Sequence, residues 1–165
     1  MKPTWSFRPS DSSDAKWMAE VRAEVMRPDL ERLGRFDATR VRQRFLDAFA
    51  PEYTRVIEVD GHDAGLVAIR PDAESYWIEH FYLAPHHQGA GIGGEVLTYL
   101  LSDPGYAGRV FRLNVLQGSS ARHLYERHGF ELDHETPMDI YMHRTPPSHT
   151  PTPVESTEMD RKSRQ

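Results

Sequence analysis

The hydrophobic and polar positions of the first fifty residues predict a short strand followed by two helices. Residues 5–8 alternate between apolar and polar side chains, as in a strand with one buried face. After the polar cluster 11–14, which offers N-cap side chains, apolar residues recur at intervals of three and four and predict a helix. Pro28 predicts a break in that helix, because its ring disfavours the helical conformation of the preceding residue. A second helix is expected from Asp37, its N-cap, up to Pro51.

After residue 51 the hydrophobic period changes, and most of the expected elements are strands. Asp60-Gly61 is a typical hairpin turn between two of them. The segment 76–83 (YWIEHFYL) has the aromatic and branched residues of a central strand and runs directly into a glycine-rich loop. The expected strands are 53–59, 64–69, 76–83, 110–116, 130–135 and 138–143, and the expected helices are 91–101 and 120–127. The whole order is β-α-α-β-β-β-α-β-α-β-β, an α/β (α+β) arrangement.

The length of 165 residues predicts one domain, which we place at residues 1–144. Residues 145–165 are rich in Pro, Ser and Thr, contain no aromatic residue, and are expected to form a disordered C-terminal tail.

Composition excludes several classes of function. The formal net charge of −5 argues against nonspecific binding to nucleic acid or to anionic membranes, both of which favour a positive surface. Without cysteine the chain has no disulfide, thiolate metal site or cysteine nucleophile, and its nine histidines lack metal-binding spacing, so no metal is expected. No segment resembles a signal peptide or a membrane span, which predicts a cytoplasmic protein.

The glycine-rich loop Gln88–Gly94 (QGAGIGG) lies between a predicted strand and a predicted helix. Its backbone N–H groups can converge at the helix N-terminus and bind phosphate, because glycine lets an anion approach the main chain closely. The loop lacks the Gly-Lys-Ser/Thr of a P-loop, and it does not have the context of a Rossmann fingerprint. These differences argue against a nucleotide-binding protein of the phosphate-loop class.

Two motifs resemble those of the GNAT N-acetyltransferase superfamily. Gln88–Gly93 is similar to its Q/R-x-x-G-x-G/A acyl-CoA loop, with Leu83-Ala84-Pro85 as the preceding strand end. Ser119–Phe130 is similar to the family segment N-x-A-R-x-L-Y-E-R-x-G-F, with Ser119 where many relatives have Asn.

The resemblance implies a mixed, mostly antiparallel sheet in which the parallel strands 76–83 and 110–116 splay apart and accept the pantetheine of acetyl-CoA. It implies main-chain hydrogen bonds from Phe81 and Leu83 to the pantetheine, and N–H groups of the loop on the pyrophosphate. The cofactor-binding residues expected on this basis are Phe81, Leu83, Gln88, Gly89, Ala90, Gly91, Ile92, Gly93, Gly94, Asn114, Ser119 and Tyr125.

Direct acetyl transfer to an amine requires a neutral amine and a proton for the departing CoA sulfur. Tyr125 matches the tyrosine that serves as general acid in the family. Glu79 is the expected base, because it precedes Leu83 by four residues and so shares its strand face. His80 points the other way unless a bulge interrupts the strand.

The implied activity is acetyl-CoA-dependent N-acetylation of a primary amine of a small molecule or peptide. The acceptor is not determined by the sequence. The acidic residues of the first helix could attract a cationic amine, whereas Arg27, Arg32 and Arg35 could bind a substrate carboxylate. The alternative is a catalytically silent acyl-CoA-binding regulatory module, and a homodimer is possible in either case.

Overall fold

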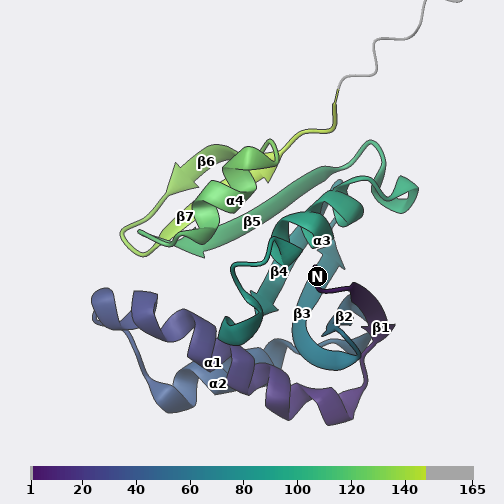
Figure 1. Cartoon of the computed structure of the whole chain (residues 1–165). Coiled ribbons are helices and arrows are strands. Elements are labelled where there is room, and N and C mark those ends of the chain that lie inside the picture. The colour runs from purple at the N-terminus through teal and green to yellow at the C-terminus, as the bar shows by residue number, and fades with distance from the viewer. Residues whose placement is uncertain (1, 148–165) are drawn as a thin grey trace, which may run out of the picture.

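A twisted seven-stranded sheet runs through the structure, a computed structural model that describes residues 2–147 (Figure 1). The predicted element order is confirmed, and the tail predicted from residue 145 lies almost entirely outside the described residues. The helices and strands are β1 Trp5–Pro9, α1 Ala15–Arg32, α2 Ala38–Ala48, β2 Thr54–Val59, β3 His62–Pro71, β4 Ser75–Leu83, α3 Ile92–Leu101, β5 Val110–Leu116, α4 Ala121–Arg127, β6 Glu131–Glu135 and β7 Asp139–Arg144. The spatial order of the strands is β1-β2-β3-β4-β5-β7-β6, and only β4 and β5 are parallel.

The predicted break at Pro28 is wrong, because α1 continues through this residue to Arg32. Proline removes one backbone N–H from the helix but leaves the groups after it free to bond. Leu33 N donates to Asp29 O at 3.0 Å and Arg35 N donates to Leu30 O at 2.8 Å, which close the end of the helix. The extra turn places the end of α1 beside the functional cavity described below.

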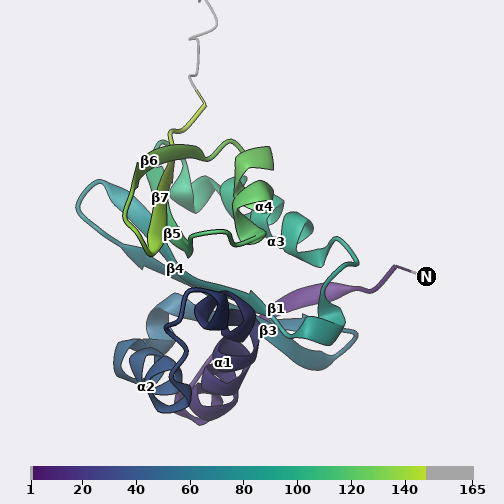
Figure 2. The ribbon, with the colours of Figure 1, turned by 90° about the vertical axis from the view of Figure 1, so that its left-hand side faces the viewer.

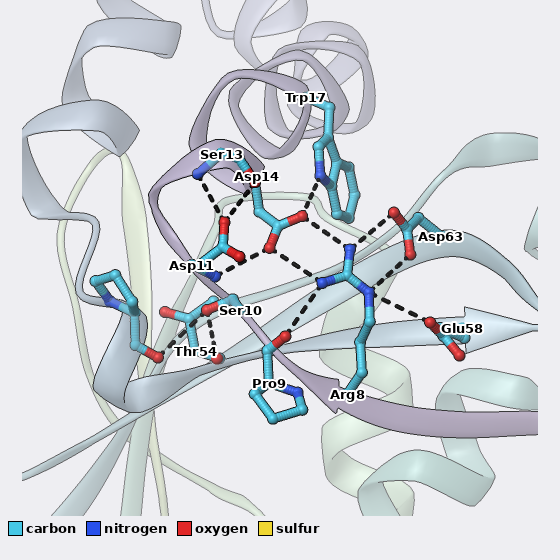
Figure 3. Close-up of polar contacts among 11 residues, drawn as sticks. Arg8, Pro9, Ser10, Asp11, Ser13, Asp14, Trp17, Thr54, Glu58 and Asp63 are labelled. Carbon is cyan, nitrogen blue, oxygen red and sulfur yellow. Dashed lines mark hydrogen bonds and ion pairs between the residues drawn. The ribbon is translucent and has the colours of Figure 1, made fainter.

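The start of α1 is fastened to the sheet by Arg8 of β1. Figure 3 shows the Arg8 guanidinium between Asp14, which directly precedes α1, and the carboxylates of Glu58 and Asp63. Arg8 Nη2 lies 2.8 Å from Asp14 Oδ1, and the indole N–H of Trp17 donates to the same carboxylate at 2.8 Å. The hydrogen bond from Arg8 is the main reason that the pKa of Asp14 is lowered to about 2. This network fixes where α1 leaves the sheet.

The helices form two layers on opposite faces of the sheet (Figure 2). Helices α1 and α2 cover one face, where Met18, Phe45 and Leu66 are fully buried. Helices α3 and α4 lie on the other face over a larger core that includes Leu97 and Phe111. Strands β2 and β3 present alternate side chains to the two cores, since Val56 and Leu66 belong to one and Ile57 and Val67 to the other.

The parallel strands β4 and β5 pair only at their starts, from Ser75 opposite Val110 to Trp77 opposite Arg112. Beyond Trp77 they separate, which confirms the predicted splay. The separation coincides with a bulge, because Ile69 and Ala68 of β3 face Ile78 and His80 of β4 and leave Glu79 as the extra residue. An opening in the middle of the sheet results.

Candidate active site

A cavity of about 570 Å³ lies at the opening between β4 and β5. The sheet side of the cavity is formed by Ile78, Glu79, His80, Phe81, Tyr82, Asn114, Val115, Leu116, Ser119, Ala121, Tyr125, Met138 and Asp139. The opposite wall is formed by Arg22, Val25, Met26, Asp29 and Leu30 of α1, by Arg35 and Asp37 of the following loop, and by Arg40, Val41 and Arg44 of α2. The candidate catalytic residues Tyr125 and Glu79 thus share one cavity.

Tyr125 of α4 belongs to the hydrophobic core and also lines the cavity. The side chain is 6% exposed, and its ring packs against Phe130 with centroids 5.4 Å apart and near Phe81 at 6.5 Å. Burial, and to a lesser degree the neighbouring Tyr82, raises the pKa of the Tyr125 phenol well above its ordinary value. The hydroxyl therefore keeps its proton at neutral pH, as a general acid must.

The bulge in β4 changes the basis on which Glu79 was chosen. Strict alternation would have given Glu79 the face of Leu83, but the extra residue breaks that alternation, and both Glu79 and His80 line the cavity. The Glu79 carboxylate accepts a hydrogen bond from Arg70 Nε at 2.7 Å through Oε1. His80 packs against Phe45 of α2 with ring centroids 4.8 Å apart. The sequence analysis left the direction of His80 dependent on a bulge, and the structure contains that bulge.

Asn114 and Ser119 lie on the β5 side of the cavity and already have partners. Asn114 Nδ2 donates to Asp139 Oδ1 at 3.1 Å, which connects β5 to β7. Ser119 Oγ accepts from Ala121 N at 3.2 Å and so stabilises the start of α4. The serine that replaces the family's usual Asn therefore performs a local capping role in this chain.

The glycine loop lies outside this cavity, and its conformation fits an anion. Gly89 and Gly91 have φ of +84° and +81°, and a Cβ at either position would meet no atom within 4 Å. No side chain caps α3, whose first helical hydrogen bond runs from Glu95 N to Gly91 O at 3.2 Å. The three preceding amides, of residues 92–94, stand before the hydrogen-bonded part of the helix and can hold a pyrophosphate.

The side chains of the loop have structural roles that the motif alone does not show. The side chain of Ile92 is 2% exposed and belongs to the core, so only its backbone can reach a ligand. A Cβ on Gly93 would lie 3.7 Å from Leu124 of α4, an ordinary van der Waals distance, so this position faces α4 without a steric need for glycine. Gln88 Nε2 donates to Leu83 O at 2.8 Å and fixes the end of β4.

The family model described as "Acetyltransferase (GNAT) domain" matches residues 50–132. The chain belongs to the GNAT acetyltransferase family. Acetyltransferases of this family use acetyl-CoA, in agreement with the loop geometry. No match was found among curated proteins.

Solved structures agree with this GNAT assignment at the level of the fold. PaiA N-acetyltransferase from Thermoplasma acidophilum, solved with coenzyme A, has a TM-score of 0.70 at 16% identity over 86% of this chain and 99% of that chain. An acetyltransferase from Thermus thermophilus gives 0.67 at 16% identity over 86% and 97%. The ribosomal-protein-S18-alanine N-acetyltransferase from Escherichia coli gives 0.66 at 15% identity over 86% and 94%.

The α1–α2 wall of the GNAT cavity carries arginines that sequence reasoning largely missed. Arg35 was considered as an acceptor-binding residue, but Arg22, Arg40 and Arg44 were not. The spacing of Arg40 and Arg44, one helical turn apart, could have indicated a shared face, although such a pair is also typical of a solvated surface.

Within residues 2–147, no three or more His, Asp or Glu side chains are grouped so that they could hold a metal ion, and no helix is long and apolar enough to cross a membrane.

Proposed function

We propose that this GNAT protein is an N-acetyltransferase that transfers the acetyl group of acetyl-CoA directly to a primary amine of a small molecule or peptide. The observation that carries the proposal is the gathering of Tyr125, Glu79 and Asn114 around one cavity where β4 and β5 separate. A module that only binds acyl-CoA has no need for an acid and a base in that position.

Acetyl-CoA supplies an activated thioester. The residues that would hold it are the main chain of Phe81 and Leu83 and the loop Gln88–Gly94. The free amides at the start of α3, together with its helix dipole, offer positive charge to the pyrophosphate. The overall negative charge of the protein does not oppose this, because the attraction is local.

Tyr125 is the proposed general acid. Burial of the phenol keeps its proton in place at neutral pH, so that the hydroxyl can donate it to the departing sulfur. Glu79 is the proposed base, directly or through a water molecule. Arg70 donates to Oε1 of its carboxylate and Glu79 lines the cavity, so Oε2 is the oxygen that we propose accepts the proton from the amine.

The test is turnover of Tyr125→Phe with saturating acetyl-CoA and a reactive amine. We expect kcat to fall by about 100-fold or more, while acetyl-CoA affinity measured by calorimetry stays within about threefold. Tyr106→Phe is the matched control, because this tyrosine packs against Tyr76 on a different side of the core, with ring centroids 4.7 Å apart. Unchanged turnover of Tyr125→Phe would remove Tyr125 from the mechanism, and binding of acetyl-CoA without turnover of any amine would favour the regulatory module.

A further inference from the structure

One wall of the cavity is rich in arginine side chains. Arg22, Arg35, Arg40 and Arg44 all line it, and within residues 2–147 none of them forms an ion pair with a carboxylate. Arg40 and Arg44 are exposed and one turn apart on α2, while Arg22 reaches across from α1 and donates to the backbone carbonyl of Val41. Two helices thus direct guanidinium groups to the same wall.

The carboxylates of the same cavity are already engaged. Asp29 pairs with Arg32 at 2.8 Å, and Glu79 is hydrogen-bonded to Arg70 at 2.7 Å. Asp139 accepts from Asn114 at 3.1 Å.

The fourth carboxylate, Asp37, accepts from the backbone amides of Thr39 and Arg40 at 3.0 and 2.9 Å as the N-cap of α2. Asp29 and Glu79 are each paired with an arginine from outside the lining, whereas Asp37 and Asp139 keep their negative charge because their donors are neutral. Four guanidinium groups therefore stand against two unpaired carboxylates, and the lining keeps an excess of positive charge that can interact with a ligand.

Two buried nitrogen atoms of cavity-lining residues, one on the α1–α2 wall and one on the sheet side, also lack hydrogen-bond partners in the described part of the chain. They are Nε of Arg22 and Nε2 of His80, a residue that is 9% exposed. The proximity of Arg22 lowers the pKa of His80 further than burial does alone, so the imidazole is neutral and the surroundings are electropositive. A buried polar nitrogen without a partner is costly, which is typical of a site completed by a ligand.

We propose that the acceptor amine carries a compact anionic group, a carboxylate or a phosphate, and that Arg22, Arg40 and Arg44 on the α1–α2 wall bind it. This inference rests on the proposed function and specifies its substrate class. An amino acid, a peptide terminus with a nearby carboxylate, or a phosphorylated amine has the required chemistry. A polyamine does not, because it would place further positive charge beside unpaired guanidinium groups.

The experiment compares amines that differ only in the anionic group. The full-length protein with saturating acetyl-CoA is assayed for thiol release with lysine against 1,5-diaminopentane, glycine against glycinamide, and phosphoethanolamine against ethanolamine. We expect the anionic member of at least one pair to have a kcat/KM at least about tenfold higher, in line with a charge-assisted hydrogen bond. The pair that shows the difference identifies the group as carboxylate or phosphate.

The double variant Arg40→Gln/Arg44→Gln tests the site itself. For the preferred anionic amine its KM should rise by about tenfold or more with kcat changed by less than about threefold, whereas the KM of the matched amine that lacks the anionic group should be unaffected. Arg127→Gln is the control, since Arg127 is exposed on α4 outside the cavity, and unchanged acetyl-CoA binding shows that each variant is folded.

The outcomes separate the two proposals. Equal or better acetylation of the amines that lack the anionic group, or a double variant with unchanged KM for the anionic amine, overturns the anionic acceptor but does not contradict the proposed N-acetyltransferase activity. Bound acetyl-CoA without thiol release by any of these amines overturns both.

Discussion

Arginine side chains occupy two different environments in this protein: one arginine is surrounded by carboxylates, and a group of arginines in the cavity wall has no carboxylate partner within residues 2–147. Arg8, at the start of α1, meets three carboxylates within 3.3 Å, those of Asp14, Glu58 and Asp63. The arginines of the cavity wall, farther along α1 and on α2, form no ion pair within residues 2–147. Paired charge stabilises the geometry of the fold, whereas unpaired charge is left for a ligand, and the same helix α1 contributes to both.

The largest effect is expected when the paired region is broken. Arg8→Met keeps an apolar stem in place of the aliphatic part of arginine but leaves Asp14, a residue that is 4% exposed, without its ion partner. We expect the free energy of unfolding in urea to fall by about 3 kcal/mol. The control variant Arg42→Met breaks an exposed ion pair with Glu20 and should leave the free energy of unfolding nearly unchanged. Similar small shifts for both variants would show that the Arg8 network is only a surface ion pair.

The pH dependence of stability should separate the two regions. Burial, and to a lesser degree the charge of Arg22, lowers the pKa of His80 from 6.5 to about 4. Between these pH values the imidazole is protonated in the unfolded state but neutral in the folded state. The contribution of His80 is therefore complete above pH 6.5 and is lost as the pH falls to about 4. Asp14, whose pKa is lowered from 3.8 to about 2, contributes above pH 3.8, and this contribution is lost as the pH falls toward about 2.

Urea titrations at intervals from pH 7.5 to 2.5 measure both contributions. His80→Leu should abolish only the slope between pH 6.5 and 4, and Arg8→Met only the fall below pH 4. A His80→Leu profile identical to that of the wild type would assign the upper slope to another group.

A smaller effect of opposite sign is expected for His80→Leu at pH 7.5. The substitution removes the buried Nε2, which has no hydrogen-bond partner within residues 2–147, together with the long 3.4 Å contact of Nδ1 with Tyr82 Oη. The net result should be a rise of about 1 kcal/mol in the free energy of unfolding while turnover decreases. His123→Leu, on the exposed face of α4, should change neither quantity. A loss of stability in His80→Leu would mean that the imidazole is well satisfied where it lies.

The smallest effect concerns the connection between α1 and the loop after β5. Arg32 Nη2 donates to Gln117 O at 2.7 Å, and a Cβ on Gly118 would approach that guanidinium to 2.7 Å. Gly118→Ala and Gly108→Ala both place a side chain at positive φ, +77° and +76°. A Cβ at Gly108, however, would meet no atom of the described residues within 4 Å. We expect Gly118→Ala to be less stable than Gly108→Ala by up to about 1 kcal/mol, the cost of the displaced hydrogen bond. Equal stabilities would show that Arg32 adapts freely.

Features that depend on neighbouring residues were predictable from the sequence. The glycine loop, the Asp37 N-cap, the hairpin turn at Asp60-Gly61 and the segment around Tyr125 are all local, because short-range backbone and capping preferences are encoded within a few residues. They were sufficient to predict the element order, the splayed strand pair and the family.

Features that depend on distant contacts were decided by the tertiary structure. Pro28 was expected to end a helix, but hydrogen bonds after it and packing against the sheet carry α1 onward. The bulge at Glu79 depends on the register in which β4 pairs with β3, and His80, which follows it, lines the cavity. Arg22 and Arg44, 22 positions apart in the chain, share a wall only because α1 and α2 pack together on one face of the sheet, which no local pattern specifies.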